Sequence, residues 1–273
     1  MNKPSVLTFV VPVRHQSNAR EWSELKSNLA HTLRSLSSQT APNWRALVVA
    51  NHGADLPPLP PKVEAVRVDF PPNPLHERGT ADEETFYDAV RLDKGRRILA
   101  GMLHAGRGGY LMVVDDDDLV SSRLAEFVAR HDGEHGWFVK DGYFWPTGGR
   151  MLYAHGNFSR YCGTSHIVRA DLYDAPARFE DASEWFVTRL LGSHVFLEEH
   201  LRARGTPLAP LPFSGAVYRI GHAGSHSRSS GLVRTFFLTR RNLRNPVRLL
   251  DAALRLRPLT TRVRGEFFGG GAA

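Results

Sequence analysis

The sequence of 273 residues has a single cysteine, Cys162, which excludes a disulfide framework and a cysteine-rich zinc site. Its longest apolar runs, such as 6–13 and 110–114, are far shorter than the roughly 20 residues of a membrane-spanning helix. No small-residue cleavage site follows the first run, so we expect no signal peptide and a cytoplasmic protein. Proline and glycine are too few for a collagenous or disordered chain, and 42% hydrophobic residues are enough for a large buried core.

The net charge of +7 is concentrated at one end of the chain. From Arg234 onward there are nine arginines against Asp251 and Glu266, so the remainder of the chain is balanced. The sequence shows neither a basic groove interleaved with aromatics nor a zinc-finger or helix-turn-helix pattern, and we expect no nucleic-acid partner. Apolar residues alternate with arginines over 233–264. This pattern is compatible with peripheral contact at the anionic inner face of a membrane, and equally with a terminal helix packed on the domain.

Apolar periodicity predicts an α/β protein with a mostly parallel sheet. Strands are expected at 6–13, 43–53, 63–70 and 110–114, and helices at 22–36, from Lys94 to Gly106, and at 121–131 with Ser121 or Ser122 as the cap. A long loop is expected over 71–93. The second half predicts short strands within 137–173 and helices near 184–191 and 195–204. We expect one catalytic domain over 1–232, with a nucleotide-binding half (1–120) and an acceptor half (121–232), and a basic amphipathic tail over 233–273.

The strongest chemical signal is the run of four carboxylates from Asp115 to Asp118, directly after the buried strand at 110–114. Ligands bind open parallel sheets at the carboxyl ends of the strands, which is where this run falls. Adjacent carboxylates repel one another, and hard oxygen ligands suit Mg²⁺ or Mn²⁺ bound together with substrate phosphates. The alternative is a solvated acidic turn before the next helix.

These residues, in this order, resemble the nucleotide-sugar-binding half of the GT-A glycosyltransferases, especially the family 2-like bacterial enzymes. The segments FVVPVRH, ANHG and DKGRRILAGMLHAGRGGYLMVVDDDDLV carry the resemblance, which spans about residues 5 to 230. It implies a Rossmann-like, three-layer α/β/α fold with a mixed, mostly parallel central sheet. Where the family usually has an Asp facing the base, this chain has Asn51. The positions that the resemblance places at the nucleotide sugar are Pro12, Val13, Arg14, Asn51, Lys94, Arg97, Asp115, Asp116, Gly163 and Thr164.

The resemblance also implies a metal site and a general base. Asp115 and Asp117 take the two positions of the Asp-x-Asp motif and would hold Mn²⁺ or Mg²⁺. The stretch AVYRIGHAGSHS is similar to the family's closing Tyr-Arg-x-His, which makes His222 the first candidate for a third ligand and His226 the second.

The family commonly places a Glu-Asp pair at the start of a late helix, and this chain has neither acid there. His194 stands at the expected Asp, and an imidazole can accept a proton near neutral pH. Glu184 and Asp181 are rival bases, as are Glu198 and Glu199.

We therefore expect a metal-dependent, inverting hexosyltransferase that moves a sugar from a nucleotide diphosphate, preferably a UDP-sugar, to a saccharide or other hydroxyl acceptor. A nucleotidyltransferase shares the strand pattern and the metal, but the segment PVRHQSNAR lacks the Gly-rich basic loop that such enzymes show after the first strand. A GT-A-like domain that only binds a nucleotide or a partner is the alternative outside catalysis, favoured by the missing Glu-Asp pair.

Overall fold

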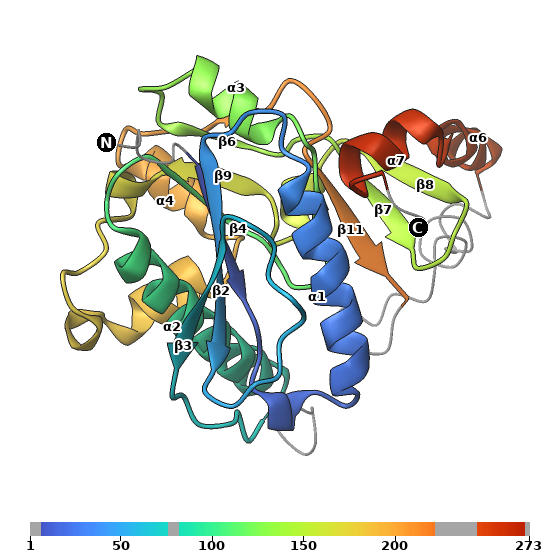
Figure 1. Cartoon of the computed structure of the whole chain (residues 1–273). Helices are drawn as coiled ribbons and strands as arrows, with labels where there is room; N and C mark the ends of the chain where they lie inside the picture. Colours follow the sequence, from blue (N-terminus) through green and yellow to red (C-terminus); the bar gives the residue numbers. More distant parts are fainter. Residues whose placement is uncertain (1–6, 76–81, 222–244, 271–273) are drawn as a thin grey trace.

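A mixed, mostly parallel sheet forms the centre of the molecule (Figure 1). The computed structural model describes residues 7–75, 82–221 and 245–270. The seven-stranded sheet has the order β10-β6-β9-β4-β1-β2-β3, in which β4, β1, β2 and β3 run parallel and β9 is antiparallel to β4 and β6. Its strands are β1 (Leu7–Pro12), β2 (Trp44–Asn51), β3 (Val63–Val68), β4 (Tyr110–Val113), β6 (Gly136–Phe138), β9 (His166–Arg169) and β10 (Ala209–Pro210). The expected fold class is confirmed.

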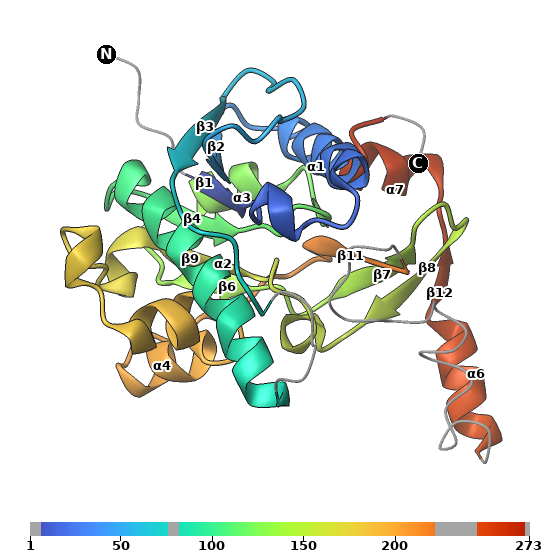
Figure 2. The same cartoon turned by 90° about the horizontal axis from the view of Figure 1, so that it is seen from below.

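Helices cover both faces of this sheet, because its strands are apolar on both sides. Phe9 and Val11 of β1 pack in one hydrophobic cluster with α1 (Trp22–Ser37) and α3 (Leu124–Arg130). Val10 packs in the other with α2 (Glu83–Ala105), the π-helix η5 (Phe186–Leu191) and α4 (Leu197–Ala203). Figure 2 shows α1 and α2 on opposite sides of the strands. Short 3₁₀ turns complete the connections: η1 (Gln16–Asn18), η2 (Phe158–Arg160), η3 (Ala170–Tyr173) and η4 (Phe179–Asp181).

A second, five-stranded sheet incorporates the C-terminal residues. Its order is β12-β8-β7-β11-β5, from β5 (Leu119–Val120), β7 (Gly142–Pro146), β8 (Met151–His155), β11 (Ala216–Ile220) and β12 (Leu256–Pro258). Phe267 and Phe268, at the end of α7 (Thr261–Phe267), are buried in a cluster with Trp145 and Leu152. The Glu266 carboxylate accepts a hydrogen bond from Ser121 Oγ at 2.7 Å. Residues 256–268 of the expected tail are thus packed on the domain, whereas α6 (Pro246–Leu254) projects from it (Figure 2), although its Ala252 is buried in the main cluster.

Two expected helix starts are wrong. The segment 71–93 is not one long loop, because α2 begins at Glu83, where Asp82 caps it by accepting a hydrogen bond from the Thr85 backbone N–H at 3.0 Å. Glu83 and Glu84 then lie in the first turn, where the helix dipole favours acids. The helix expected from Ser121 begins at Leu124 with Arg123 at its N-cap position.

Candidate functional site

A cleft of about 340 Å³ lies where β1 and β4 end and α2 passes over them. Such a cleft at the carboxyl ends of parallel strands is the usual ligand site of open α/β sheets. Its lining includes eight residues that the sequence pointed to: Pro12, Arg14, Lys94, Arg97, Asp115, Asp116, Asp117 and His194. Residues that the sequence analysis missed also line it, among them Asn73, Tyr87, Arg91, Asp93, Ser193 and Tyr218.

The four consecutive aspartates have different surroundings. Asp115 forms an ion pair with Lys94, with Oδ1 2.5 Å from Nζ, and both side chains are partly exposed. Asp118 is fully buried, and its carboxylate accepts hydrogen bonds from Thr164 Oγ1 at 2.6 Å and from Cys162 Sγ at 3.1 Å. Burial, followed by the negative charges of Asp117 and Asp115, raises the pKa of Asp118 well above its usual range. The first three aspartates therefore serve the cleft, whereas Asp118 belongs to the interior behind it.

Gly163 and Thr164 support the acidic run from behind. A Cβ on Gly163 would lie 2.8 Å from both Asp115 Oδ2 and Lys94 Nζ, so glycine leaves room for the ion pair. Thr164 Oγ1 accepts a hydrogen bond from the Asp115 backbone N–H at 2.9 Å and donates one to Asp118. Neither residue is part of the cleft lining; Gly163 lines a small adjoining cavity of about 20 Å³, together with Lys94 and His194.

His194 lies beside the Lys94–Asp115 pair, on the segment between η5 and α4. Its Nε2 is buried and has no hydrogen-bond partner among the residues that the structure describes. Burial, aided by the positive charge of Lys94, lowers the pKa of His194 to about 4, although a hydrogen bond to the Arg160 backbone opposes the shift. Since Nε2 is unpartnered, we assign that bond to Nδ1. The ring is then neutral at pH 7 and carries its lone pair on Nε2.

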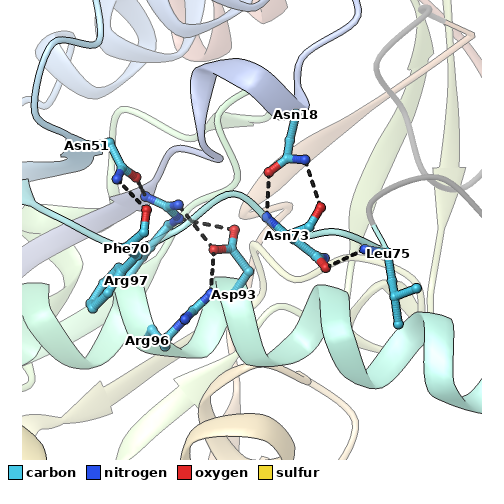
Figure 3. Close-up of polar contacts among 8 residues, drawn as sticks. All are labelled: Asn18, Asn51, Phe70, Asn73, Leu75, Asp93, Arg96 and Arg97. Carbon is cyan, nitrogen blue, oxygen red and sulfur yellow. Dashed lines mark hydrogen bonds and ion pairs between the residues drawn. The ribbon is translucent and has the colours of Figure 1, made fainter.

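Arg97 is held by a buried polar cluster rather than by the cleft alone (Figure 3). Its guanidinium donates from Nε and Nη2 to Asp93 at 3.1 Å and from Nη1 to Asn51 Oδ1 at 2.7 Å. Asn51 in turn donates from Nδ2 to the Phe70 carbonyl oxygen at 2.6 Å. Both ends of the Asn51 amide are therefore engaged by protein, and Asn51 is absent from the cleft lining. It positions Arg97, and the expected contact with a base finds no support. Val13 is likewise core, fully buried in the cluster around α1.

The remaining candidates are not brought into the cleft. Asp181 and Glu184 are exposed and absent from its lining, and the Asp181 carboxylate lies 3.9 Å from Arg178. Glu198 binds the buried His166 at 2.9 Å, and a hydrogen bond from His166 lowers the pKa of Glu198. His222 and His226 lie outside the described residues. Of the proposed bases, His194 is the one that the fold places beside the aspartates.

The chemistry of the cleft fits a divalent ion shared with a substrate. Within the described ranges, no group of three or more His, Cys, Asp or Glu side chains is placed to enclose a metal. Mg²⁺ is, however, usually bound through one or two carboxylates plus substrate phosphates rather than by an all-protein cage. Asp115 and Asp117 both line the cleft and could supply such carboxylates, and the absence of a side chain at Gly163 leaves room for the Asp115 carboxylate.

Comparison with known proteins gives distant fold likenesses. No family model and no curated protein sequence matches the chain. Among solved structures, S. aureus TarS is similar at 13% identity and a TM-score of 0.41, over 78% of this chain and 36% of TarS, so this chain spans about a third of that protein. Rv0371C of Mycobacterium tuberculosis H37Rv, solved as a complex with manganese, is similar at 12% identity and a TM-score of 0.35, over 79% of this chain and 92% of its own. A Desulfovibrio desulfuricans G20 protein assigned as a nucleotide-diphospho-sugar transferase matches at 13% identity and a TM-score of 0.34, over 91% and 98% of the two chains. These are likenesses in the arrangement of the fold.

None of the helices that the structure describes combines the length and apolarity needed to cross a bilayer.

Proposed function

We propose that the chain is a metal-dependent glycosyltransferase that moves a sugar from a nucleoside diphosphate, preferably UDP, to a saccharide or other hydroxyl acceptor. The observation that carries this proposal is the composition of one cleft. Asp115, Asp116 and Asp117 line it together with the cationic Arg14 and Lys94, beside a neutral His194. A diphosphate needs positive charge around it, and carboxylates at the same place need a cation to share with it.

The residues have complementary roles in that reaction. Negative charge grows on the diphosphate as the sugar–phosphate bond breaks, and the Lys94 ammonium, partly exposed at the cleft, would stabilise it electrostatically. Mn²⁺ or Mg²⁺ held by Asp115 and Asp117 would add Lewis-acid stabilisation of the same charge. His194 would take the proton of the acceptor hydroxyl on Nε2. A bound diphosphate would raise the pKa of His194 from about 4 towards the working pH, since a nearby negative charge favours the imidazolium. Direct displacement by the acceptor oxygen gives inversion.

The first experiment is thermal unfolding with UDP, GDP, dTDP and CDP, each with and without Mn²⁺. A ligand at about one hundred times its Kd adds about 2.7 kcal/mol to the free energy of unfolding. We expect one nucleotide to stabilise the protein only when metal is present, and D117N to abolish the shift. E184Q, which makes the same chemical change at an exposed acid outside the cleft, is the control and should retain it. The absence of any nucleotide-dependent shift in the unaltered protein would refute the proposal.

A domain that binds nucleotide without catalysis is the second candidate, because the carboxylates that line the described part of the cleft are Asp93, which is paired with two arginines, and the three aspartates assigned to the metal and the donor. Hydrolysis of the bound donor in the absence of acceptor separates the two. In H194Q, loss of the general base should lower the rate of sugar transfer roughly 10²–10⁴-fold with nucleotide affinity kept. Transfer at the wild-type rate would remove His194 from the mechanism.

We further propose that α6 contacts an anionic membrane surface. Val247, Leu250 and Leu254 lie on one side of this helix with exposed fractions of 72%, 61% and 65%, and Arg248 and Arg255 flank them. Exposed apolar side chains bordered by cations are the pattern of helices that lie in the interface.

Sedimentation with vesicles tests the membrane contact. The protein should bind vesicles that contain phosphatidylserine and not neutral ones, and L250D should lose the binding. Y161D, which places the same charge at another exposed apolar residue, should bind like the unaltered protein. Equal binding by both variants would argue against a role of α6.

A further inference from the structure

The loop after β3 contains a buried side-chain amide whose orientation is fixed by its contacts. Among the described residues, its oxygen is hydrogen-bonded and its nitrogen is not. Asn73, only 6% exposed, lines the cleft. Its backbone N–H donates to Asn18 Oδ1 at 2.8 Å, and its carbonyl oxygen accepts from Asn18 Nδ2 at 2.9 Å (Figure 3). Its own Oδ1 accepts from the Leu75 backbone N–H at 2.9 Å. Asn73 Nδ2 is buried and has no hydrogen-bond partner in the described part of the chain.

The orientation of this amide is determined by its contacts. Rotating the Asn73 amide by half a turn would set Nδ2 against the Leu75 N–H, a donor against a donor. The reciprocal pair with Asn18 holds the backbone of the same residue from the other side. Nδ2 therefore stays a donor without an acceptor, and a buried donor of this kind calls for one from outside the protein.

The position of Asn73 indicates which acceptor that is. The acidic run follows β4, whereas Asn73 follows β3, and β1 and β2 lie between them in the sheet. Three strand spacings amount to roughly 14 Å. A nucleoside diphosphate whose phosphates lie at Lys94 and the aspartates would extend its base towards the β3 side. There the carboxylate of Asp93 is paired with Arg96 at 3.2 Å and Arg97 at 3.1 Å, so its negative charge does not repel a carbonyl oxygen of a base.

We propose that Asn73 Nδ2 donates a hydrogen bond to a carbonyl oxygen of the donor's nucleobase and that Asn73 is a residue that determines which base is accepted. This inference rests on the proposed function. The oxygen and the nitrogen of the Asn51 amide are both hydrogen-bonded within the protein, and we therefore assign the recognition of the base to Asn73.

The test is calorimetric titration of N73D at mildly alkaline pH, where the introduced carboxyl is ionised. The substitution keeps an oxygen for the Leu75 N–H and replaces the donor by an acceptor. The Kd of whichever of UDP, GDP, dTDP and CDP binds the unaltered protein best should rise roughly tenfold or more in the presence of Mn²⁺. The Kd of inorganic pyrophosphate with Mn²⁺, which has no base, should stay within about twofold.

N157D is the matched control. It makes the same change at an exposed asparagine outside the cleft lining, whose side chain caps no helix. We expect it to bind nucleotide and pyrophosphate like the unaltered protein. Replacing the base carbonyl by a thiocarbonyl provides the same test on the unaltered chain, and one thio-substituted nucleotide should bind several-fold more weakly.

Three outcomes overturn the inference. Equal weakening of nucleotide and pyrophosphate in N73D would assign the effect to charge alone. An unchanged nucleotide Kd in N73D would show that water satisfies Nδ2. In both cases the unaltered protein still binds nucleotide with metal and the proposed function stands. Failure of the unaltered protein to bind either ligand would instead remove the proposed function, and this inference with it.

Discussion

The two ends of the cleft hold their polar groups in opposite ways. At the acidic end, the Lys94 and Asp115 side chains meet while 26% and 27% of their surfaces remain exposed. At the other end, Arg97 is 1% exposed and its guanidinium is engaged by Asp93 and Asn51. A charge near solvent can exchange its partner for a metal ion or a phosphate, whereas an enclosed one serves as scaffold. We therefore expect Lys94 and Asp115, on the β4 side, to exchange partners when a ligand binds, and Arg97, on the β2–β3 side, to keep its position.

The largest effect on stability is expected at the enclosed end. R97M removes the more buried of the two arginines that pair with Asp93, and breaking a buried pair costs about 3–5 kcal/mol. Arg96 contacts the same Asp93 at 3.2 Å but is more exposed, so R96M should lower the free energy of unfolding by about 1 kcal/mol or less. Urea denaturation of both variants measures the difference. Similar losses would mean that Arg97 is no more structural than its neighbour.

The next largest effect is expected on the pH dependence of the free energy of unfolding. Folding lowers the pKa of His194 from 6.5 to about 4, so between these values the unfolded chain binds more protons than the folded one. The free energy of unfolding should therefore increase by at most about 3 kcal/mol as the pH rises from about 4 to 6.5. H194Q should flatten this dependence.

Asp118 contributes with the opposite sign. Burial raises the pKa of Asp118, so the folded protein holds this proton more tightly than the unfolded chain does. The contribution of Asp118 to the free energy of unfolding is therefore lost as the pH rises from the usual pKa of an Asp to the raised pKa. Because that contribution is common to the unaltered protein and H194Q, the difference between their urea-denaturation profiles isolates His194. Parallel profiles would show that the imidazole is protonated to the same extent in both states.

The smallest effect on stability is expected for G163A. The added Cβ would meet only the flexible ends of Asp115 and Lys94, which can shift, so the free energy of unfolding should change by less than about 1 kcal/mol. The Kd of nucleotide with Mn²⁺ should nevertheless rise several-fold, because the displaced carboxylate holds the ion less well. G108A, whose Cβ would have no neighbour within 4 Å, is the control for calorimetry. Unchanged nucleotide binding in G163A would mean that Asp115 does not hold the metal ion.

The sequence predicted the acidic end better than the amide end, for a physical reason. Asp115 follows a buried strand directly, and Lys94 begins the strongly patterned part of α2, so local periodicity predicted the elements that carry both residues, and the family resemblance implied that they share a site. The start of α2 depends on Asp82, which caps the helix by accepting a hydrogen bond from the Thr85 backbone N–H. This segment is polar, so apolar periodicity does not mark the start of the helix. The position of Asn73 depends on Asn18, 55 residues away. Asn51 was expected at the base because the family resemblance implied it, and its hydrogen bond to Arg97, 46 residues away, is a contact of similar range. Contacts of this range leave no periodic trace in a sequence.

One contact of α2 bears on how the side chains that line the cleft are positioned relative to one another. A Cβ on Gly95 would lie 1.9 Å from the Val187 carbonyl oxygen of η5, and one on Gly192 would lie 2.1 Å from the Arg91 carbonyl oxygen of α2. The main chains of the two helices are thus in contact, with Lys94 directly before Gly95 and His194 two residues after Gly192. Side chains can yield, but backbones in contact move together. Under the proposed function, Lys94 faces the leaving phosphate and His194 receives the acceptor's proton, and the close contact of the two backbones at these glycines fixes the distance between them.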